Sequence, residues 1–447
     1  MVLLKTLKTF FTKDDFDFDS KNIDLYKFHP QIRIFLVFNG IFFNNSESYI
    51  RFHIFLIHSF IIHQLNIVNF QVLLATIELM IIHHGIITGD YSFATECFCY
   101  FIILTTIPLV YISVLFGRNK IFQLLNSMDR DFLYICRLEP KYRNLFLNGQ
   151  LLIWQLCIVW LVFAMSIVTM YLISTIAILF YQSLFATQTE NTVRPLIFPL
   201  WLPEDDPYRT PNYEVFFFFE IIVCLMVPQI FCVYVYVLFH ILLHRYYLMD
   251  LIIFDCEIMF NDLDERVIDL PQNDPNRMKV QLILNKRIER IVKWHNMVFE
   301  TVNAVSSVYG PPLVYQVVIS SLAICLMAYQ VAESLDNGKF HVIFAMLCIA
   351  TCVQLWIPCY LGTLIRNKAF SIGDAIWSSG WHETSLGRLV RQNLIIIIMR
   401  SQKPVSIKFT GLPNLDLETF SSRTSRGNRL ISVFSSCTYV VHLRRIF

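Results

Sequence analysis

The chain has 447 residues, of which 55% are hydrophobic and 16% are charged, and its mean hydropathy is +0.53. A soluble domain carries roughly 25% charged residues, so this composition excludes an ordinary soluble domain and indicates a protein that lies in lipid. The net charge of +2 gives no strongly basic surface of the kind that binds nucleic acid. We therefore expect a lipid bilayer, and no nucleic acid, among the partners.

The N-terminal stretch "MVLLKTLKTFFTKDDFDFDSK" has neither an apolar core nor a cleavage site of small residues. It does not predict a cleavable signal peptide, and we expect the first span to act as the insertion signal. Asn44, Asn45 and Ser46 form a glycosylation sequon. We expect this sequon to be unused, because the topology derived below places it in the cytoplasm.

Six segments are apolar enough to cross the membrane. A helix that crosses about 30 Å of hydrocarbon needs about 20 mostly apolar residues. The candidates are 54–82, 93–116, 151–180, 213–240, 311–333 and 342–363. A seventh, with a weaker signal, is expected near the C-terminus. The predicted fold class is therefore all-α, a polytopic membrane protein with seven transmembrane helices.

Lysine and arginine residues alternate between the loops. Four segments hold 7, 6, 8 and 7 of them, in the order 1–53, 117–150, 241–310 and 364–408. The other inter-span loops hold 0, 2 and 1, in the order 83–92, 181–212 and 334–341. Basic loops stay in the cytoplasm, so the N-terminus is predicted inside and the C-terminus outside.

This inverted topology disfavours G-protein-coupled receptors, whose N-terminus is outside. The stretch "MDRDF" at Met128–Phe132 mimics the Asp-Arg-Tyr signature of those receptors, but it follows the second span and lacks the tyrosine.

The chain is predicted to divide into six segments along its length. They are a cytoplasmic N-terminus 1–53, helices one to four 54–240, a cytoplasmic loop and helical anchor 241–310, helices five and six 311–363, a further anchor segment 364–403, and a pore helix with an atypical tail 404–447.

The cytoplasmic loop 241–310 contains a predicted helix with an apolar seam. Its members recur at alternating spacings of 4 and 3, as on one face of a helix: Leu284, Ile288, Ile291, His295, Val298 and Val302, followed by Val305. The seam either packs against its own bundle, which we favour, or forms an oligomer contact. A second short helix is predicted at Leu386–Met399, and Pro404 stops it.

No catalytic or metal-binding pattern is present in the sequence. His240 and His244 have zincin spacing, but "HILLH" lacks the glutamate that would act as base, and interfacial packing is the favoured reading. His83 and His84 are interpreted as a solvated helix end. We therefore predict no enzyme, no cofactor and no metal. Carboxylates within spans lie near the outer ends rather than at the midplane, which disfavours a transporter: Glu78, Glu96, Glu214, Glu220 and Glu333.

The outer halves of spans two, three, four and six are rich in aromatic and small polar residues. Besides Tyr100 and Tyr171, the candidates for ligand contact are Phe98, Phe101, Met170, Ser174, Phe217, Phe218 and Phe344. A pocket between helices with such a lining suits a small apolar ligand. The alternative is that these side chains only fill the bundle or face lipid.

The C-terminal third resembles the insect odorant receptor family. The resemblance rests on three stretches: Ala375, Trp377 and Trp381 in "GDAIWSSGWHE"; Arg400, Ser401, Gln402, Lys403 and Pro404; and Leu415 to Phe420, with Leu417, Glu418, Thr419 and Phe420 closest to the family motif. Trp377 replaces the usual tyrosine and Asp416 a usual serine. The loop Arg194–Glu214 and "RIVKWHNMV" at Arg290–Val298 support the likeness, which runs from about residue 24 to 420.

This resemblance implies a subunit of a ligand-gated cation channel at the plasma membrane of an olfactory neuron dendrite. It implies a small volatile ligand and a hetero-tetramer with an odorant co-receptor, joined through segments 241–310 and 364–403. The long inner insertion of the co-receptor is absent between spans four and five, so the chain resembles an odorant-specific subunit. Related gustatory receptors end in Thr-Tyr and then Gln-Phe. The chain has Thr438 and Tyr439 without Gln-Phe at the required spacing.

The tail departs from the family pattern. Arg423, Arg426 and Arg429 would enter the bilayer on the pore helix, where each costs roughly 2.5–3.5 kcal/mol at mid-depth. We favour a misread or retained segment at about 421–431. The alternative is a true variant whose arginines face an aqueous vestibule.

Overall fold

The computed structural model describes residues 9–14, 16–38, 69, 71–185, 194, 196–201, 206–338, 342–403 and 405–407, and all regular elements in these ranges are helices. They include α2 (Leu25–Phe28), α3 (Pro30–Phe38), a helix at Gln71–Thr88, α5 (Tyr91–Ile135), α6 (Pro140–Phe185), α7 (Asn212–Glu257), the 3-10 helix η1 (Glu265–Asp269), α8 (Pro275–Asp336), α9 (Val342–Ser378), the 3-10 helix η2 (Ser385–Leu389) and α10 (Arg391–Ser401). The predicted all-α class is confirmed.

Six of the helices are long and apolar enough to cross a membrane. Five of them continue well past the predicted spans. The 62 residues of α8 extend over about 90 Å at 1.5 Å per residue, which is about three times the hydrocarbon thickness. The predicted fifth span and the seam helix before it are therefore one continuous helix, as are the predicted sixth span and the segment up to Ser378.

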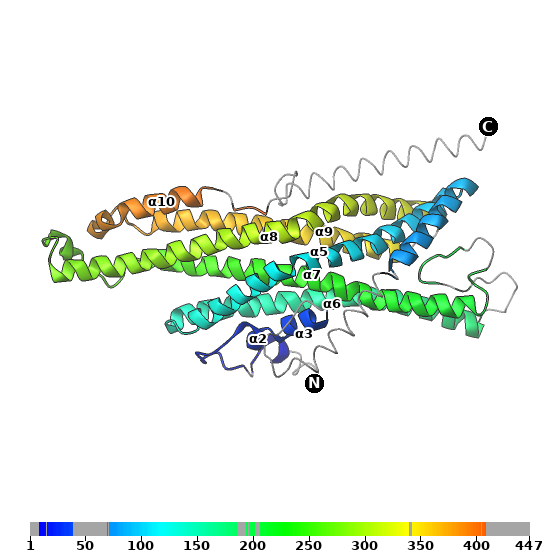
Figure 1. Ribbon diagram of the computed structural model, residues 1–447, viewed down its shortest axis with the longest axis horizontal. Coiled ribbons are helices and arrows are strands. Elements are labelled where there is room, and N and C mark those ends of the chain that lie inside the picture. The colour runs from blue at the N-terminus through cyan, green and yellow to red at the C-terminus, as the bar shows by residue number, and fades with distance from the viewer. Residues whose placement is uncertain are drawn as a thin grey trace.

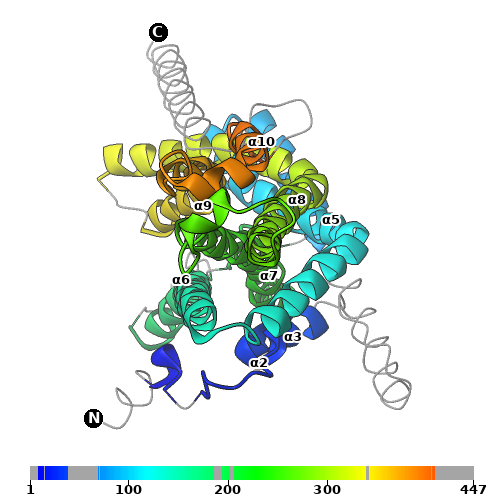
Figure 2. The same ribbon diagram turned by 90° about the vertical axis from the view of Figure 1, so that its left-hand side faces the viewer.

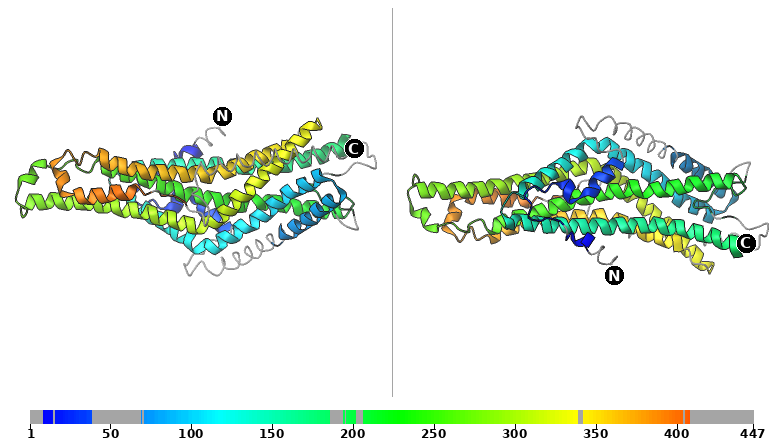
Figure 3. Two further views of the ribbon diagram at one scale, coloured as in Figure 1. Left: turned by 90° about the horizontal axis from the view of Figure 1, so that it is seen from above. Right: turned by 90° about the horizontal axis from the view of Figure 1, so that it is seen from below.

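The long helices run side by side in an elongated bundle (Figure 1). α7 lies at its centre and contacts α5, α6, α8 and α9 (Figure 2). The short helices α2 and α3 lie against the side of the bundle, and α10 folds back beside α9 (Figure 3). The two ends of the bundle differ. One end carries residues 194–201, and the other carries η1, η2 and α10.

The predicted seam of α8 faces the interior of the chain. Each of its members is at most 5% exposed: Leu284, Ile288, Ile291, His295, Val298, Val302 and Val305. Burial and the neighbouring Arg400 guanidinium lower the pKa of His295 to about 4. The Arg400 guanidinium also lies 3.9 Å from the centre of the Phe299 ring. Within the described chain, the seam therefore packs against its own bundle and joins α8 to the end of α10.

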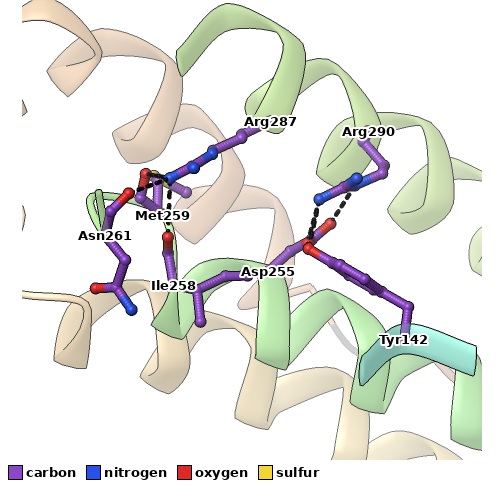
Figure 4. Close-up of polar contacts among 7 residues, drawn as sticks. All are labelled: Tyr142, Asp255, Ile258, Met259, Asn261, Arg287 and Arg290. Atoms are coloured by element: carbon purple, nitrogen blue, oxygen red, sulfur yellow. Dashed lines mark hydrogen bonds and ion pairs between the residues drawn. The ribbon is translucent and has the colours of Figure 1, made fainter. Parts of the chain in front are cut away.

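A polar cluster of Asp255, Arg290 and Tyr142 joins α7, α8 and α6 (Figure 4). Arg290 Nε donates to Asp255 Oδ2 at 2.6 Å, and Arg290 also donates to the Tyr142 hydroxyl at 2.7 Å. The Tyr142 hydroxyl donates to Asp255 Oδ1. Nearby, Arg287 donates to three carbonyls just beyond the end of α7, those of Ile258, Met259 and Asn261.

A buried chain of polar contacts, which we call the buried relay, joins the N-terminal segment to the bundle. His29 lies 3.2 Å from Gln150, whose amide lies 3.1 Å from His244. His244 in turn lies 3.2 Å from Asp131, which accepts a 2.6 Å bond from Arg245. His240 and His244 are fully buried, so both side chains pack inside the bundle. Asp131 of "MDRDF" is the acceptor that anchors this relay.

The family-like stretch at 375–403 comprises the end of α9, the turn that contains η2, and α10. Ala375 and Trp381 are 9% exposed, whereas Trp377 is 59% exposed and stacks on His382. A Cβ on Gly387 would overlap the carbonyl oxygen of Trp381, so this turn requires glycine. α10 begins at Arg391 and ends at Ser401, followed by Gln402 and Lys403. The predicted helix at Leu386–Met399 is thus a 3-10 turn followed by α10.

Several predictions fall outside the described residues. They concern most of the first span, the sequon at residues 44–46, Pro404, the motif from Leu415 to Phe420 with Leu417, Glu418 and Thr419, and the tail 421–447.

Candidate ligand-binding site

An outer cavity of about 260 Å³ opens near residues 194–201, between α5, α6 and α9. Its lining mixes charged, hydroxyl and apolar side chains: Glu96, Tyr100, Tyr171, Thr175, Ile178, Arg194, Leu196, Ile197, Pro199, Tyr208, Ile343 and Phe344. The loop wall is held in place because Glu220 of α7 accepts a 2.8 Å hydrogen bond from the Ile197 amide. We call this space the outer cavity.

Two tyrosines meet at the floor of the outer cavity. The Tyr171 hydroxyl donates to the Tyr100 hydroxyl at 2.7 Å. The Tyr100 ring also packs against Phe344 of α9, with centroids 5.8 Å apart, and against Phe198 of the loop at 5.3 Å. α5, α6, α9 and the loop therefore converge on Tyr100.

An inner cavity of about 170 Å³ lies deeper, between α5, α6, α8 and α9. Its lining is mostly apolar: Ile102, Ile103, Thr106, Ile107, Trp160, Phe163, Ala164, Ile167, Val168, Gln316, Ile319, Ser320, Ala323, Leu347, Ala350, Thr351 and Gln354. The buried Gln316 amide has no hydrogen-bond partner among the described residues. Such a cavity accepts an apolar group and also offers the Gln316 amide as a polar contact.

Of the nine predicted contact residues, Tyr100, Tyr171 and Phe344 line the outer cavity. Phe98, Phe101 and Phe217 instead pack against the buried cluster beside it. The Ser174 hydroxyl is turned back onto the carbonyl of Tyr171 in its own helix.

Met170 and Phe218 face away from the bundle, with 54% and 60% of their surface exposed. The physical reason is helical geometry, since adjacent residues point about 100° apart. Met170 therefore points outward where Tyr171 points inward. These two residues do not line either cavity.

Sequence reasoning missed the contribution of α8 and most of the loop wall. α8 gives Gln316, Ile319, Ser320 and Ala323 to the inner cavity, and the loop gives Arg194, Ile197 and Tyr208 to the outer one. The sequence did contain a signal for the contribution of α8: Gln316 and Ser320 are polar residues four positions apart, on one face of an otherwise apolar span. Among the described residues, no group of three or more histidine, cysteine, aspartate or glutamate side chains could hold a metal ion.

The family model described as 7tm Odorant receptor matches residues 91–425. The chain belongs to the odorant receptor family. Odorant receptor 67c of Drosophila melanogaster is 26% identical over 162 residues, which are 36% of this chain and 38% of that one. Odorant receptor 82a of the same species is 30% identical over 122 residues, 27% of this chain and 31% of that one. The matched segments thus span about a third of these curated receptors.

The solved structure of the olfactory receptor OR5 from Machilis hrabei in complex with eugenol has the same fold. It superposes with a TM-score of 0.70, at 14% identity, over 92% of this chain and 98% of that one. The odorant receptor coreceptor of Anopheles gambiae is also similar, 25% identical over 153 residues, 33% of this chain and 31% of that one. The family is one of receptors rather than of enzymes, and a co-receptor is among the similar proteins.

Proposed function

We propose that this receptor is an odorant-specific subunit of a ligand-gated, non-selective cation channel, and that small volatile ligands bind in the outer and inner cavities. The observation that carries the proposal is the pair of cavities between α5, α6, α8 and α9 in a chain of the odorant receptor family. The eugenol-bound relative of the same fold supports a small-molecule ligand. The inner cavity, which is mostly apolar with a few polar groups, suits such ligands.

The proposed assembly is a hetero-tetramer with an odorant co-receptor in the plasma membrane of a sensory dendrite. The similarity to a co-receptor supports a shared architecture. We propose that the ends of α7, α8 and α9 together with α10 form the subunit contact. α10 carries exposed apolar side chains, Ile396 and Met399, that are 64% and 62% exposed. Such side chains favour contact with a partner.

Co-expression with a co-receptor tests the channel directly. We expect a cation current within milliseconds of odorant application, and we expect it to persist in excised patches without GTP, because the proposed pore belongs to the receptor complex. The measurement is the current of cells with and without the co-receptor against an odorant panel. A current that requires GTP would identify a metabotropic receptor instead, and a response restricted to soluble tastants would favour a gustatory role.

The proposed orientation places the N-terminus in the cytoplasm and the C-terminus outside, since basic residues concentrate in alternate loops. A tag before Met1 should be stained only after the cells are permeabilised. A tag inserted in the loop after Thr88 serves as the control and should be stained on intact cells. The opposite pattern would reject the orientation.

A further inference from the structure

The two cavities follow one another along the same helices. Seen from the end that carries residues 194–201, α5 and α9 run inward and α6 runs outward. On each helix a residue of the outer cavity is followed one turn deeper by a residue of the inner cavity: Tyr100 by Ile103, Tyr171 by Val168, and Phe344 by Leu347. None of the described residues lines both cavities. Tyr100, Tyr171 and Phe344 therefore stand at the boundary between them.

The hydroxyl groups at this boundary are incompletely used. Two hydroxyls carry two hydrogens. One hydrogen bridges Tyr171 and Tyr100 at 2.7 Å, a normal distance between two hydroxyl oxygens. The Tyr171 hydroxyl also lies 3.4 Å from the carbonyl oxygen of Ile197, which is longer than the usual range for such bonds. Among the described residues, one buried hydroxyl hydrogen thus lacks a good acceptor, and leaving it so costs free energy.

We propose that the Tyr100–Tyr171 hydroxyl pair recognises a hydrogen-bond acceptor on the ligand and so sets the chemical class of odorant. This inference rests on the proposed function. The preferred ligand carries one carbonyl oxygen, as in a ketone, an aldehyde or an ester, joined to an apolar chain. The carbonyl oxygen accepts the unused hydrogen of the pair, while the chain lies in the inner cavity.

The surroundings favour an uncharged acceptor with an apolar chain. Tyr100 is 5% exposed and is packed by the rings of Phe344 and Phe198. Beneath it the inner cavity is lined by isoleucine, alanine and leucine side chains. A charged group in the inner cavity would lose its hydration with no charged side chain in the lining to pair with it, which is strongly unfavourable. A hydrocarbon would fill the same space but would leave the hydroxyl hydrogen unsatisfied.

Phenylalanine substitutions at the two tyrosines test the inference, because they keep the rings and remove only the hydroxyls. The full receptor, co-expressed with a co-receptor, is compared for 2-heptanone, heptanal and hexyl acetate against heptane. Two readouts are used, the half-maximal concentration for current and the ligand-induced shift in Tm of the purified complex. Tyr111→Phe is the matched control, a buried tyrosine of α5 that lines neither cavity.

For the wild type and Tyr111→Phe we expect the carbonyl ligands to act at concentrations about tenfold lower than heptane, the ratio that one hydrogen bond supplies. The double variant Tyr100→Phe/Tyr171→Phe should lose this preference. Each single variant should keep it, because removing one hydroxyl frees the hydrogen of the other. This non-additive pattern is not expected of a purely structural role.

Three results would overturn the inference: a double variant that keeps the carbonyl preference, a single variant that loses it as fully as the double, or a wild type that prefers none of the three carbonyl ligands to heptane. If the double variant is too unstable to purify, the two single variants decide, because a single variant that no longer prefers the carbonyl ligands to heptane would overturn the inference. Failure of the proposed channel function would look different. In that case the Tm shifts would persist while no ligand on any panel produced a current.

Discussion

Asp255→Asn is expected to destabilise the receptor by about 3 kcal/mol and to remove most of it from the cell surface. Asp255 is buried and accepts hydrogen bonds from both Arg290 and Tyr142. Breaking a buried ion pair by neutralising one partner costs about 3–5 kcal/mol. We take the lower end because the Arg290 side chain is 24% exposed. Surface labelling and thermal unfolding of the solubilised receptor measure the effect.

Asp374→Asn provides the matched control, since Asp374 lies on the exposed side of α9. The same change of charge there should shift stability by less than about 0.5 kcal/mol. Tyr142→Phe should lie between the two, at about 1 kcal/mol for one hydrogen bond. Equal stability of Asp255→Asn and Asp374→Asn would show that the cluster in Figure 4 does not hold α6, α7 and α8 together.

The seam of α8 was predictable because burial on one helix face forces a regular spacing. Steps of 4 and 3 from Leu284 to Val302 keep every member on one side of the helix, and all are buried. The length of α8 was not predictable in the same way. Hydropathy indicates where a helix leaves the lipid, but it does not indicate where the helix itself ends. α8 continues without a break from the seam into the predicted fifth span, even through Pro311 and Pro312.

The candidate site was predictable as a region but not residue by residue. Aromatic enrichment identified the outer halves of three of the helices that line the outer cavity. It could not separate inward from outward residues, because Met170 and Tyr171 differ only by one step of helical rotation. The contribution of α8 and the loop depends on tertiary packing. The same is true of the relay that brings His29 to Gln150 and His244, residues more than a hundred positions away.

The current of Ala350→Phe compared with Ile349→Phe tests the central claim most directly, that the ligand lies between α5, α6, α8 and α9. Ala350 lines the inner cavity, whereas its neighbour Ile349 is 55% exposed on the outside of the bundle. A phenyl ring at 350 should fill much of the roughly 170 Å³ available. At equal surface expression, we expect the odorant concentration for half-maximal current to rise about tenfold or more. This is the loss expected when about two methylene groups of the ligand can no longer be buried. Ile349→Phe should respond like the wild type. An unchanged response of Ala350→Phe, with the receptor folded and at the surface, would place the ligand elsewhere and contradict the account.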